Sequence, residues 1–190
     1  MIKKAFIDVE TGGLDPKVNP LLELGCIFEI GGIEETANFR CRPYVDQVTV
    51  KQVLDVNGYT QDEIETWNDP AETFQTFKKR LSRCVNPYDK TDKMFLIGYN
   101  VKFDEGFIRA FFSRNGDKFF SSFFHWPSID VAVLAATAMK DIRHKMPNFK
   151  LATVAKTLGI EVRDDKLHGA SYDIALTREI FMAVTGEKSV

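Results

Sequence analysis

The sequence predicts an α/β fold in which a mixed sheet is flanked by helices. Apolar segments with strand-like patterning follow one another at the beginning of the chain, separated by short turns. From about residue 94 onwards, apolar segments alternate with segments of helical periodicity. Consecutive strands followed by such alternation are typical of a mixed sheet. A length of 190 residues with 44% hydrophobic side chains suffices for one buried core, so we expect a single domain over 1–190.

The first half of the chain is predicted to form a meander of three strands. Residues 3–9 and 21–30 have the apolar content of buried strands. Gly31 and Gly32 then mark a hairpin turn into a third strand at about 33–42. Three short helices are expected to follow these strands, at 49–57, 60–66 and 71–84.

The second half is predicted to alternate between strands and helices. After a polar loop at 85–93, residues 94–99 form a central strand and a helix follows at about 102–115. The Phe-rich stretch 119–126 has neither helical nor strand periodicity, and we interpret it as a partly exposed aromatic wedge. The last expected elements are a strand or helix start at 128–138 and helices near 148–158 and 171–184.

Composition and charge argue against several classes of protein. The net charge of −2 provides no overall basic field, so affinity for nucleic acid must come from a local patch or from metal ions. No apolar stretch approaches the roughly 18 residues of a membrane span, and Asp8 interrupts the first one, unlike a signal peptide. Cys26, Cys41 and Cys84 are odd in number and far apart, which argues against disulfides and a zinc site. We therefore expect a cytoplasmic protein with no membrane partner.

Two carboxylates stand at the end of the first predicted strand. Side chains alternate between the two faces of a strand, so Asp8 and Glu10 share one face with Phe6. A rise of about 3.3 Å per residue leaves the two acids roughly 6–7 Å apart along the strand. Like charges beside a buried strand repel each other and are costly to desolvate. Because a bound cation would relieve both costs, the pair indicates a metal site.

Two further acids lie on helix faces that are otherwise apolar. Asp104 belongs to the apolar stripe of its helix, whereas the adjacent Glu105 lies over Arg109 as a solvent-side ion pair. Asp173 lies on the apolar stripe of the last predicted helix. A helix-start acid near the macrodipole, or a tertiary pair with a distant Arg, would explain either residue alone. Together with the strand pair, they predict four acids from three elements that form an oxygen-rich site for Mg²⁺ or Mn²⁺.

His168 precedes Asp173 by a short segment and is the candidate proton acceptor. Gly169 makes the local backbone flexible, so His168 is expected on a loop just above the acids. An imidazole there can take a proton from water near neutral pH. A structural loop histidine is the alternative, and it is the interpretation that we give to His125 and His144.

Three segments resemble the motifs of the DEDDh family of 3′-to-5′ exonucleases, which includes DnaQ-like and RNase T-like proteins. The first motif matches Phe-Ile-Asp-Val-Glu-Thr-Gly-Gly-Leu at 6–14. The second, Asn-x-x-Phe-Asp-x-x-Phe, matches 100–107, and a His four residues clear of an Asp matches the third at 168–173. A lesser family feature is Leu-Glu-Leu-Gly at 22–25. The motifs occur in the family's order, and the resemblance covers about residues 5–183.

The resemblance implies an RNase H-like fold with a mixed sheet of about five strands. It also implies a phosphodiester hydrolase that binds two Mg²⁺ or Mn²⁺ ions about 3.5–4 Å apart and releases 5′-nucleotides from a 3′ end. The implied catalytic acids and metal ligands are Asp8, Glu10, Asp104 and Asp173. Asp8 would bridge both ions, and Asp104 would hold the second through water. His168 would act as the general base toward the attacking water.

Residues that bind the substrate are expected within these motifs. The resemblance places the backbone of Thr11, Gly12 and Gly13 near the terminal nucleotide, but a plain turn at the end of a strand is an equal alternative. It likewise implies that Asn100 and Phe103 contact the substrate. Aromatic rings that stack on bases contribute roughly 1–3 kcal/mol each, and core packing is the alternative for every ring. The candidate rings are Phe103, Tyr59, Phe119, Phe120, Phe123, Phe124 and Trp126.

The expected partner is nucleic acid with a free 3′ end, with single strands favoured, and a homodimer or a polymerase partner is left open. Of two basic segments, 140–150 is favoured for contacts to the nucleic-acid backbone, and 78–83 is explained as a solvated helix face. An RNase H-type endonuclease is one alternative function, against which the spacing of His168 and Asp173 argues. A catalytically idle nucleic-acid-binding module is the other, against which the intact set of acids argues.

Overall fold

The computed structural model describes residues 2–163, 165, 167 and 169–187. The strands are β1 (Lys3–Thr11), β2 (Leu21–Ile30), β3 (Ile33–Arg40), β4 (Phe95–Gly98) and β5 (Ile129–Asp130). The α-helices are α1 (Lys51–Asn57), α2 (Gln61–Glu65), α3 (Pro70–Cys84), α4 (Lys102–Arg114), α5 (Val131–Ala138), α6 (Leu151–Thr157) and α7 (Ala170–Thr185). No helix in the described part of the chain is long and apolar enough to cross a membrane.

The strands form a mixed five-stranded sheet in the order β3-β2-β1-β4-β5. β1, β2 and β3 are antiparallel neighbours, whereas β4 runs parallel to β1 and β5 runs parallel to β4. Gly31 and Gly32 connect β2 to β3 with φ values of 60° and 84°, as a tight hairpin with two left-handed residues requires. The mixed sheet of about five strands that the sequence predicted is confirmed.

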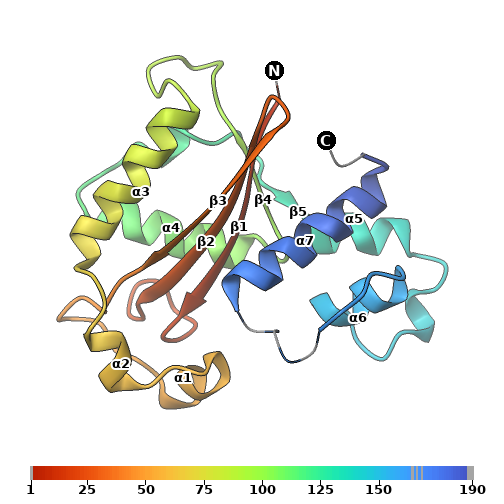
Figure 1. Ribbon diagram of the computed structural model, residues 1–190, viewed down its shortest axis with the longest axis horizontal. Coiled ribbons are helices and arrows are strands. Elements are labelled where there is room, and N and C mark those ends of the chain that lie inside the picture. The colour runs from red at the N-terminus through yellow and green to blue at the C-terminus, as the bar shows by residue number, and fades with distance from the viewer. Residues whose placement is uncertain (1, 164, 166, 168, 188–190) are drawn as a thin grey trace.

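Helices cover both faces of the sheet, as Figure 1 shows, with α3 and α4 on one side and α5, α6 and α7 on the other. Ala5, Ile7 and Val9 of β1 belong to the core that contains the phenylalanines of α3 and α4. Phe6 points to the other face, where its ring packs edge-on against Phe181 of α7 at 5.4 Å. β1 is therefore enclosed between two helical layers, and the sheet end beside α1 carries its last residues.

The segment 128–138, for which a strand or a helix start was expected, contains both. β5 ends at Asp130, and the Asp130 side chain caps α5 by accepting a hydrogen bond from the Ala132 N–H at 2.9 Å. Asp130 also accepts a hydrogen bond from the Asn100 N–H at 3.1 Å. This one carboxylate therefore connects the end of β5 to the turn that leads into α4.

The interpretation of 119–126 as an aromatic wedge is wrong for most of its rings. Phe120, Phe123 and Phe124 are buried, because a 3₁₀ turn at Phe120–Ser122 and a bridge between Met94 and Phe124 direct them into the core. Their partners include Phe112 of α4, whose ring centroid lies 5.6 Å from that of Phe120. Of the segment's aromatic rings, Phe119 and Trp126 are the exposed ones.

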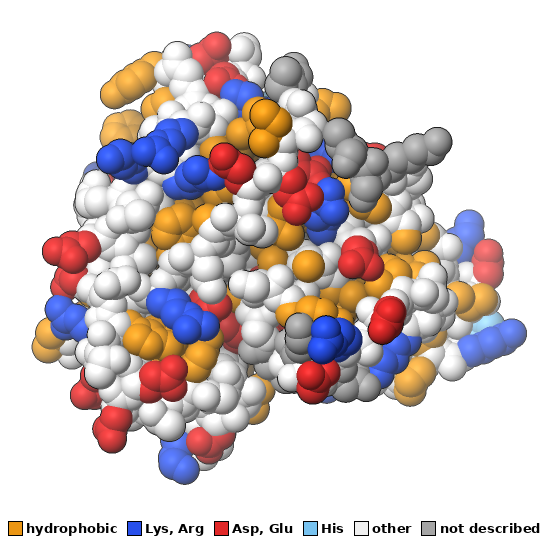
Figure 2. Space-filling model, viewed as in Figure 1, with side chains coloured by type: hydrophobic (Ala, Val, Ile, Leu, Met, Phe, Trp, Pro, Cys, Tyr) orange, Lys and Arg blue, Asp and Glu red, His pale blue; other side chains and the backbone are white. Residues whose placement is uncertain are grey.

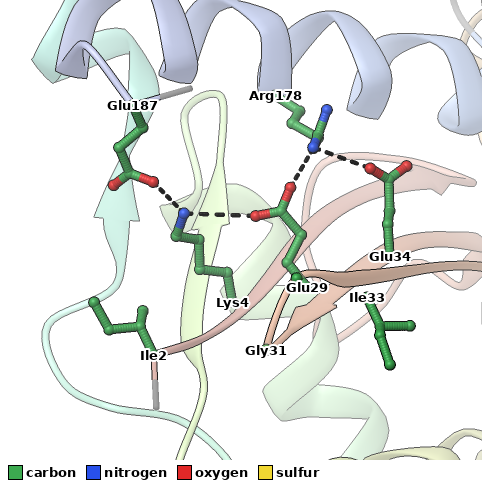
Figure 3. A pocket seen from close by; sticks show the side chains of 9 residues that line it. Ile2, Lys4, Glu29, Gly31, Ile33, Glu34, Arg178 and Glu187 are labelled. Carbon is green, nitrogen blue, oxygen red and sulfur yellow. Dashed lines mark hydrogen bonds and ion pairs between the residues drawn. The ribbon is translucent and has the colours of Figure 1, made fainter. Parts of the chain in front are cut away.

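A network of ion pairs fixes α7 to the sheet at the hairpin end, remote from the end of β1. Figure 3 shows Lys4, Glu29 and Arg178 converging beside the β2–β3 turn. They line a hollow of about 540 Å³. Arg178 of α7 pairs with Glu29 of β2 and, at 3.0 Å, with Glu34 of β3. Lys4 lies 3.5 Å from Glu29. Arg178 thus fastens the middle of α7 to β2 and β3, and Lys4 joins β1 to the same network through Glu29.

Candidate functional site

Asp8 and Glu10 lie among the last residues of β1, where the regular pairing between strands ends. Glu10 faces Glu23 of β2, and the register shifts between Glu10 and Thr11, which marks a β-bulge. Bulges commonly redirect side chains near functional sites. Asp8 is half-buried and Glu10 is 9% exposed, so both carboxylates are largely withdrawn from water.

Asp104 reaches β1 from α4, in the helical layer on one face of the sheet. The pairing of β1 with β4 extends as far as Phe6 and Ile97, and β1 continues beyond it. There the Val9 N–H donates a hydrogen bond to Asp104 Oδ1 at 3.0 Å. Asp104 is 4% exposed and lies in the first turn of α4, where the helix dipole favours a negative charge. The prediction that it points inward is confirmed, and the partner is a backbone N–H.

Asp173 comes to the same end of the sheet from α7, in the opposite layer. It is half-buried and lies in the first turn of that helix. Gly25, which faces Asp8 across β1 and β2, makes the close approach of α7 possible. A Cβ atom at Gly25 would lie 3.1 Å from Ala170 Cβ and 3.3 Å from the Ala170 carbonyl oxygen. The absence of a side chain at Gly25 therefore allows the start of α7 to close over the sheet beside Asp8.

The electrostatics of these acids show that they form one cluster. Burial raises the pKa of Asp8 well above its ordinary value, and the carboxylates of Asp104, Glu10 and Asp173 raise it further. Burial, followed by the nearby charges of Asp173, Glu23 and Asp104, raises the pKa of Glu10 to about 8. Burial also raises the pKa of Asp104 to about 8, although the bond from the Val9 N–H acts to lower it. Asp8, Glu10 and Asp104 are thus each costly to ionise in these buried, acidic surroundings.

The donor set fits a hard divalent cation. No described Lys, Arg or His is among the groups that act on Asp8, Glu10 or Asp104, so no basic neighbour there offsets their repulsion. Carboxylate oxygens are the ligands that Mg²⁺ and Mn²⁺ prefer. Within the described residues, no three His, Cys, Asp or Glu side chains already stand in an arrangement that could hold an ion. The acids form a repelling cluster whose oxygens are of the kind that a hard divalent cation prefers.

Glu105 has charged partners, unlike its neighbour Asp104, and it is more buried than the sequence predicted. The ion pair with Arg109 is present at 2.8 Å, but Glu105 is 7% exposed and does not lie on the solvent side. Its carboxylate also accepts hydrogen bonds from Ser128 at 2.8 Å and Lys102 at 3.1 Å. Burial acts to raise its pKa, but these hydrogen bonds outweigh burial, so the pKa is lowered. Glu105 is therefore a satisfied structural anion.

The predicted general base, His168, lies outside the described residues. Gly169, which follows it, is extended with φ −115° and ψ 120° and directly precedes α7. The role assigned to His168 stays a prediction.

The turn of Thr11, Gly12 and Gly13 is closely packed. The Gly12 N–H donates to the Pro20 carbonyl at 2.9 Å, and the Thr11 hydroxyl donates to the Gly13 carbonyl at 2.7 Å. A Cβ atom at Gly13 would lie 2.3 Å from Asn19 Cγ, so a side chain cannot be accommodated there. These contacts support the plain-turn alternative for the two glycines, and contact with a substrate stays a prediction.

Asn100 and Phe103 flank the start of α4. Asn100 is exposed and has a φ of 61°, a left-handed conformation that Asn tolerates better than most residues. Its carbonyl accepts a hydrogen bond from the Phe103 N–H at 3.0 Å. Phe103 is half-buried against Phe107, with ring centroids 5.0 Å apart, so one part of the ring packs on the core and another reaches solvent.

The basic segment 78–83 lies on α3, and Figure 2 shows Lys and Arg side chains gathering over that helix. Part of this charge is already neutralised, because Lys78 pairs with Asp117 at 2.6 Å and Arg80 pairs with Glu35. Elsewhere on this face, side chains of both signs are interspersed. The described residues therefore present no continuous basic track on the face in Figure 2.

A protein-family model described as Exonuclease matches residues 5–181. The chain belongs to the exonuclease family. The family resemblance inferred from the three sequence motifs is thereby confirmed.

Curated relatives and solved structures agree with this assignment. A Ribonuclease T from Marinobacter nauticus is 29% identical over 94% of this chain and 80% of its own length. A Ribonuclease T from Shewanella frigidimarina is 27% identical, with the same coverage of 94% and 80%. Product-bound exonuclease I has a TM-score of 0.73 at 21% identity, over 98% of this chain and 44% of that one. A zinc-bound complex of E. coli exonuclease I with single-stranded DNA has a TM-score of 0.78 at 22% identity, over 99% and 41%.

This exonuclease-family chain thus spans less than half the length of those exonuclease I chains. The likeness concerns the fold, and it confirms the RNase H-like architecture that the sequence predicted.

Sequence reasoning missed a cluster of residues beside the acids. Glu23 of β2 is 2% exposed and accepts hydrogen bonds from Arg40 Nε at 2.6 Å and from the Tyr59 hydroxyl. The Tyr59 ring packs edge-on against Trp67, with centroids 4.9 Å apart. A charged residue between Leu22 and Leu24 was the available signal, because an acid within an apolar strand needs a partner. Its partners, however, come from distant parts of the chain.

The raised pKa values predict how stability depends on pH in the metal-free protein. In the folded state Glu10 keeps its proton up to about pH 8, because its pKa is raised to that value. In the unfolded state it loses the proton near the ordinary pKa of a glutamate. The folded state then binds more protons between these limits, so stability falls as pH rises through that window. In EDTA at pH 8, Glu10→Gln should raise the Tm by at least about 2–4 °C, the shift given by 1 kcal/mol in a chain of this size.

Glu105→Gln is the matched control and should act with the opposite sign. Its folded pKa is lowered, so its contribution is present above the unfolded value and lost in acid. The Tm at pH 8 should therefore fall in this variant. Thermal melts at pH 5 and pH 8, with and without Mg²⁺, measure both effects. A Tm for Glu10→Gln at or below that of the unmodified protein at pH 8 would contradict the electrostatic account.

Gly25→Val should displace the start of α7 and weaken the response to metal. Added side-chain atoms collide with Ala170, which costs about 1–3 kcal/mol of stability and moves Asp173 relative to Asp8. The increase in Tm on adding Mg²⁺ should be smaller than in the unmodified protein. Gly106→Ala is the control, because its Cβ would meet only Pro16 Cγ, at 3.7 Å. That change should stabilise α4 by about 0.5–1 kcal/mol and keep the full Mg²⁺ response.

Proposed function

We propose that this chain is a metal-dependent 3′-to-5′ exonuclease that hydrolyses terminal phosphodiesters and releases 5′-nucleotides. The observation that carries the proposal is the cluster of Asp8, Glu10, Asp104 and Asp173, whose charges act on one another at the open end of β1. A buried group of like charges costs free energy unless a cation is bound, and such groups are typical of functional sites. Membership of the exonuclease family supplies the reaction class.

Two Mg²⁺ or Mn²⁺ ions would be held by the four acids, with Asp8 shared between them. The electrostatics support this central role for Asp8, because the other three acids all raise its pKa. Glu10 and Asp173 would complete one ion's ligands, and Asp104 would face the other. When bound, the ions would neutralise the charge that develops on the attacking and leaving oxygens. Phosphoryl transfer needs mainly such positioning and charge stabilisation, so no covalent nucleophile is required.

The residues of the chain have separable tasks in this proposal. The Val9 N–H holds one oxygen of Asp104 by a hydrogen bond, and the other oxygen would be the one offered to a metal ion. His168 would accept the proton of the attacking water. The 3′ oxygen of the penultimate nucleotide would leave, and the terminal phosphate would stay with the released 5′-nucleotide. Phe103 would stack on a terminal base with the part of its ring that is exposed to solvent.

The proposed substrate is a single strand with a free 3′ end. Support comes from the similar structures, which include E. coli exonuclease I in complex with a dT13 oligonucleotide. The curated relatives are named Ribonuclease T. DNA and RNA strands of matched sequence therefore form the first comparison to make.

A 5′-labelled single strand incubated with the protein and Mg²⁺ or Mn²⁺ should shorten as a ladder from its 3′ end, and EDTA should stop the reaction. Internal cuts would favour the RNase H-type endonuclease. Binding of the strand without any cutting, under both ions and with either sugar, would favour the idle binding module. Either of these results would overturn the proposal.

Asp104→Asn should lower the rate by at least about 10²-fold, because losing one anionic ligand removes several kcal/mol of charge stabilisation. The amide oxygen can still accept the Val9 N–H bond, so folding should be retained. Asp8→Ala should abolish activity with the fold intact or stabilised. Glu105→Gln is the matched control beside Asp104 and should keep most of the rate. Equal losses in both neighbouring variants would show that α4 geometry, not the Asp104 charge, matters.

His168→Ala should lower the rate by about 10²–10⁴-fold, as expected for loss of a general base, with little change in metal affinity. The pH–rate profile should also lose its dependence on a group that titrates near neutrality. Metal affinity can be followed through the Tm as Mg²⁺ is added. An unchanged rate and profile in this variant would exclude His168 as the base.

A further inference from the structure

Glu23 is the centre of a polar cluster that no part of the proposed reaction uses. It lies opposite Glu10 in the antiparallel register of β1 and β2, and opposite residues in such pairs have Cβ atoms about 4.5–5.5 Å apart. The two acids nevertheless differ in their hydrogen-bond partners. Both oxygens of Glu23 accept hydrogen bonds, one from Asn38 at 2.7 Å and the other from Arg40 and Tyr59.

Arg40 is held in a fixed orientation at the end of β3. Its Nε donates to Glu23, and its guanidinium lies 5.3 Å from the Trp67 ring centroid and 5.9 Å from that of Tyr59. Its side chain is nevertheless 48% exposed. A guanidinium that is oriented by a carboxylate and by aromatic rings keeps its terminal N–H donors aligned, and these donors match the geometry of a phosphate.

This cluster borders the acidic site. Besides the pairing of Glu10 with Glu23, burial and the bond to Glu23 raise the pKa of Tyr59, and the Glu10 carboxylate raises it further. The ring of Tyr59 is therefore within electrostatic reach of Glu10. Two residues before Tyr59, the Asn57 amide donates to the Thr11 carbonyl at 3.0 Å, which joins α1 to the end of β1.

We propose that Arg40 binds a phosphate of the substrate strand upstream of the scissile bond, and that Glu23 is the residue that positions it. This inference rests on the proposed nuclease function and names the residue that holds the strand beside the acids. The four acids repel a polyanion, so a strand needs a cation close by to lie along them. Arg40 pairs with Glu23 through Nε, which leaves its terminal N–H groups to face the strand.

Binding can be tested without cleavage in the Asp8→Ala background. The Kd of a short single-stranded oligonucleotide is measured at several salt concentrations, with and without the additional change Arg40→Gln. Loss of one phosphate contact should weaken binding about 10-fold and reduce the slope of log Kd against log salt by about 0.7. A change in local packing alone would not alter this slope.

Arg83→Gln in the same background is the matched control. It removes the same charge from an exposed position in the last turn of α3 and should leave the slope as it was. Arg40→Lys should restore the slope but only part of the affinity, because Lys keeps the charge and lacks the planar donors. An unaltered slope in Arg40→Gln, or an equal change in Arg83→Gln, would overturn the assignment of Arg40.

The role of Glu23 is tested by a double-mutant cycle in the cutting protein. Glu23→Gln should raise KM more than it lowers kcat, and adding Arg40→Gln should raise KM little further, because both changes remove the same contact. Fully additive effects would exclude positioning through Arg40. If the unmodified protein bound the strand with the expected slopes but never cut it, the proposed function would fail and the binding assignment would stand.

Discussion

The main constraint on this structure is the mutual repulsion of carboxylates that are buried at one end of β1. Asp8, Glu10 and Asp104 are largely withdrawn from water, and burial together with neighbouring negative charge raises the pKa of each. Such an arrangement lowers stability at neutral pH unless a cation is bound. The surrounding fold must therefore be stable enough to hold the acids together, and the helices packed on both faces of the sheet provide that stability.

Three local features turn this constraint into a defined site. The Val9 N–H fixes Asp104 where β1 extends beyond its pairing with β4. Gly25 allows the first turn of α7 to lie against the sheet, which brings Asp173 in from the other side. Near the middle of the same helix, Arg178 pairs with β2 and β3. The first turn and the middle of α7 are thus each held against the sheet.

Glu10 and Glu23 show how two facing carboxylates acquire different roles. Glu23 pairs with Arg40 and accepts hydrogen bonds from Tyr59 and Asn38, so these partners compensate for its burial. Glu10 has no such partner among the described residues that act on it, and its pKa is raised to about 8. Glu105 and Asp104 repeat the contrast on α4, where hydrogen bonds lower the pKa of the first and burial raises that of the second. Cations and hydrogen bonds therefore decide which acids are structural and which are available to a ligand.

The sequence by itself determined the order of strands and helices, the family and the inward direction of Asp104, because these follow from local periodicity and from motifs short enough to read along the chain. Only the tertiary structure decided that Glu105 is buried, since its third partner, Ser128, comes from a distant turn. It also decided that Phe123 lies in the core and that Arg40 and Tyr59 meet Glu23. Periodicity predicts which face a side chain occupies, but its partner on that face is brought there by packing between elements far apart in the chain.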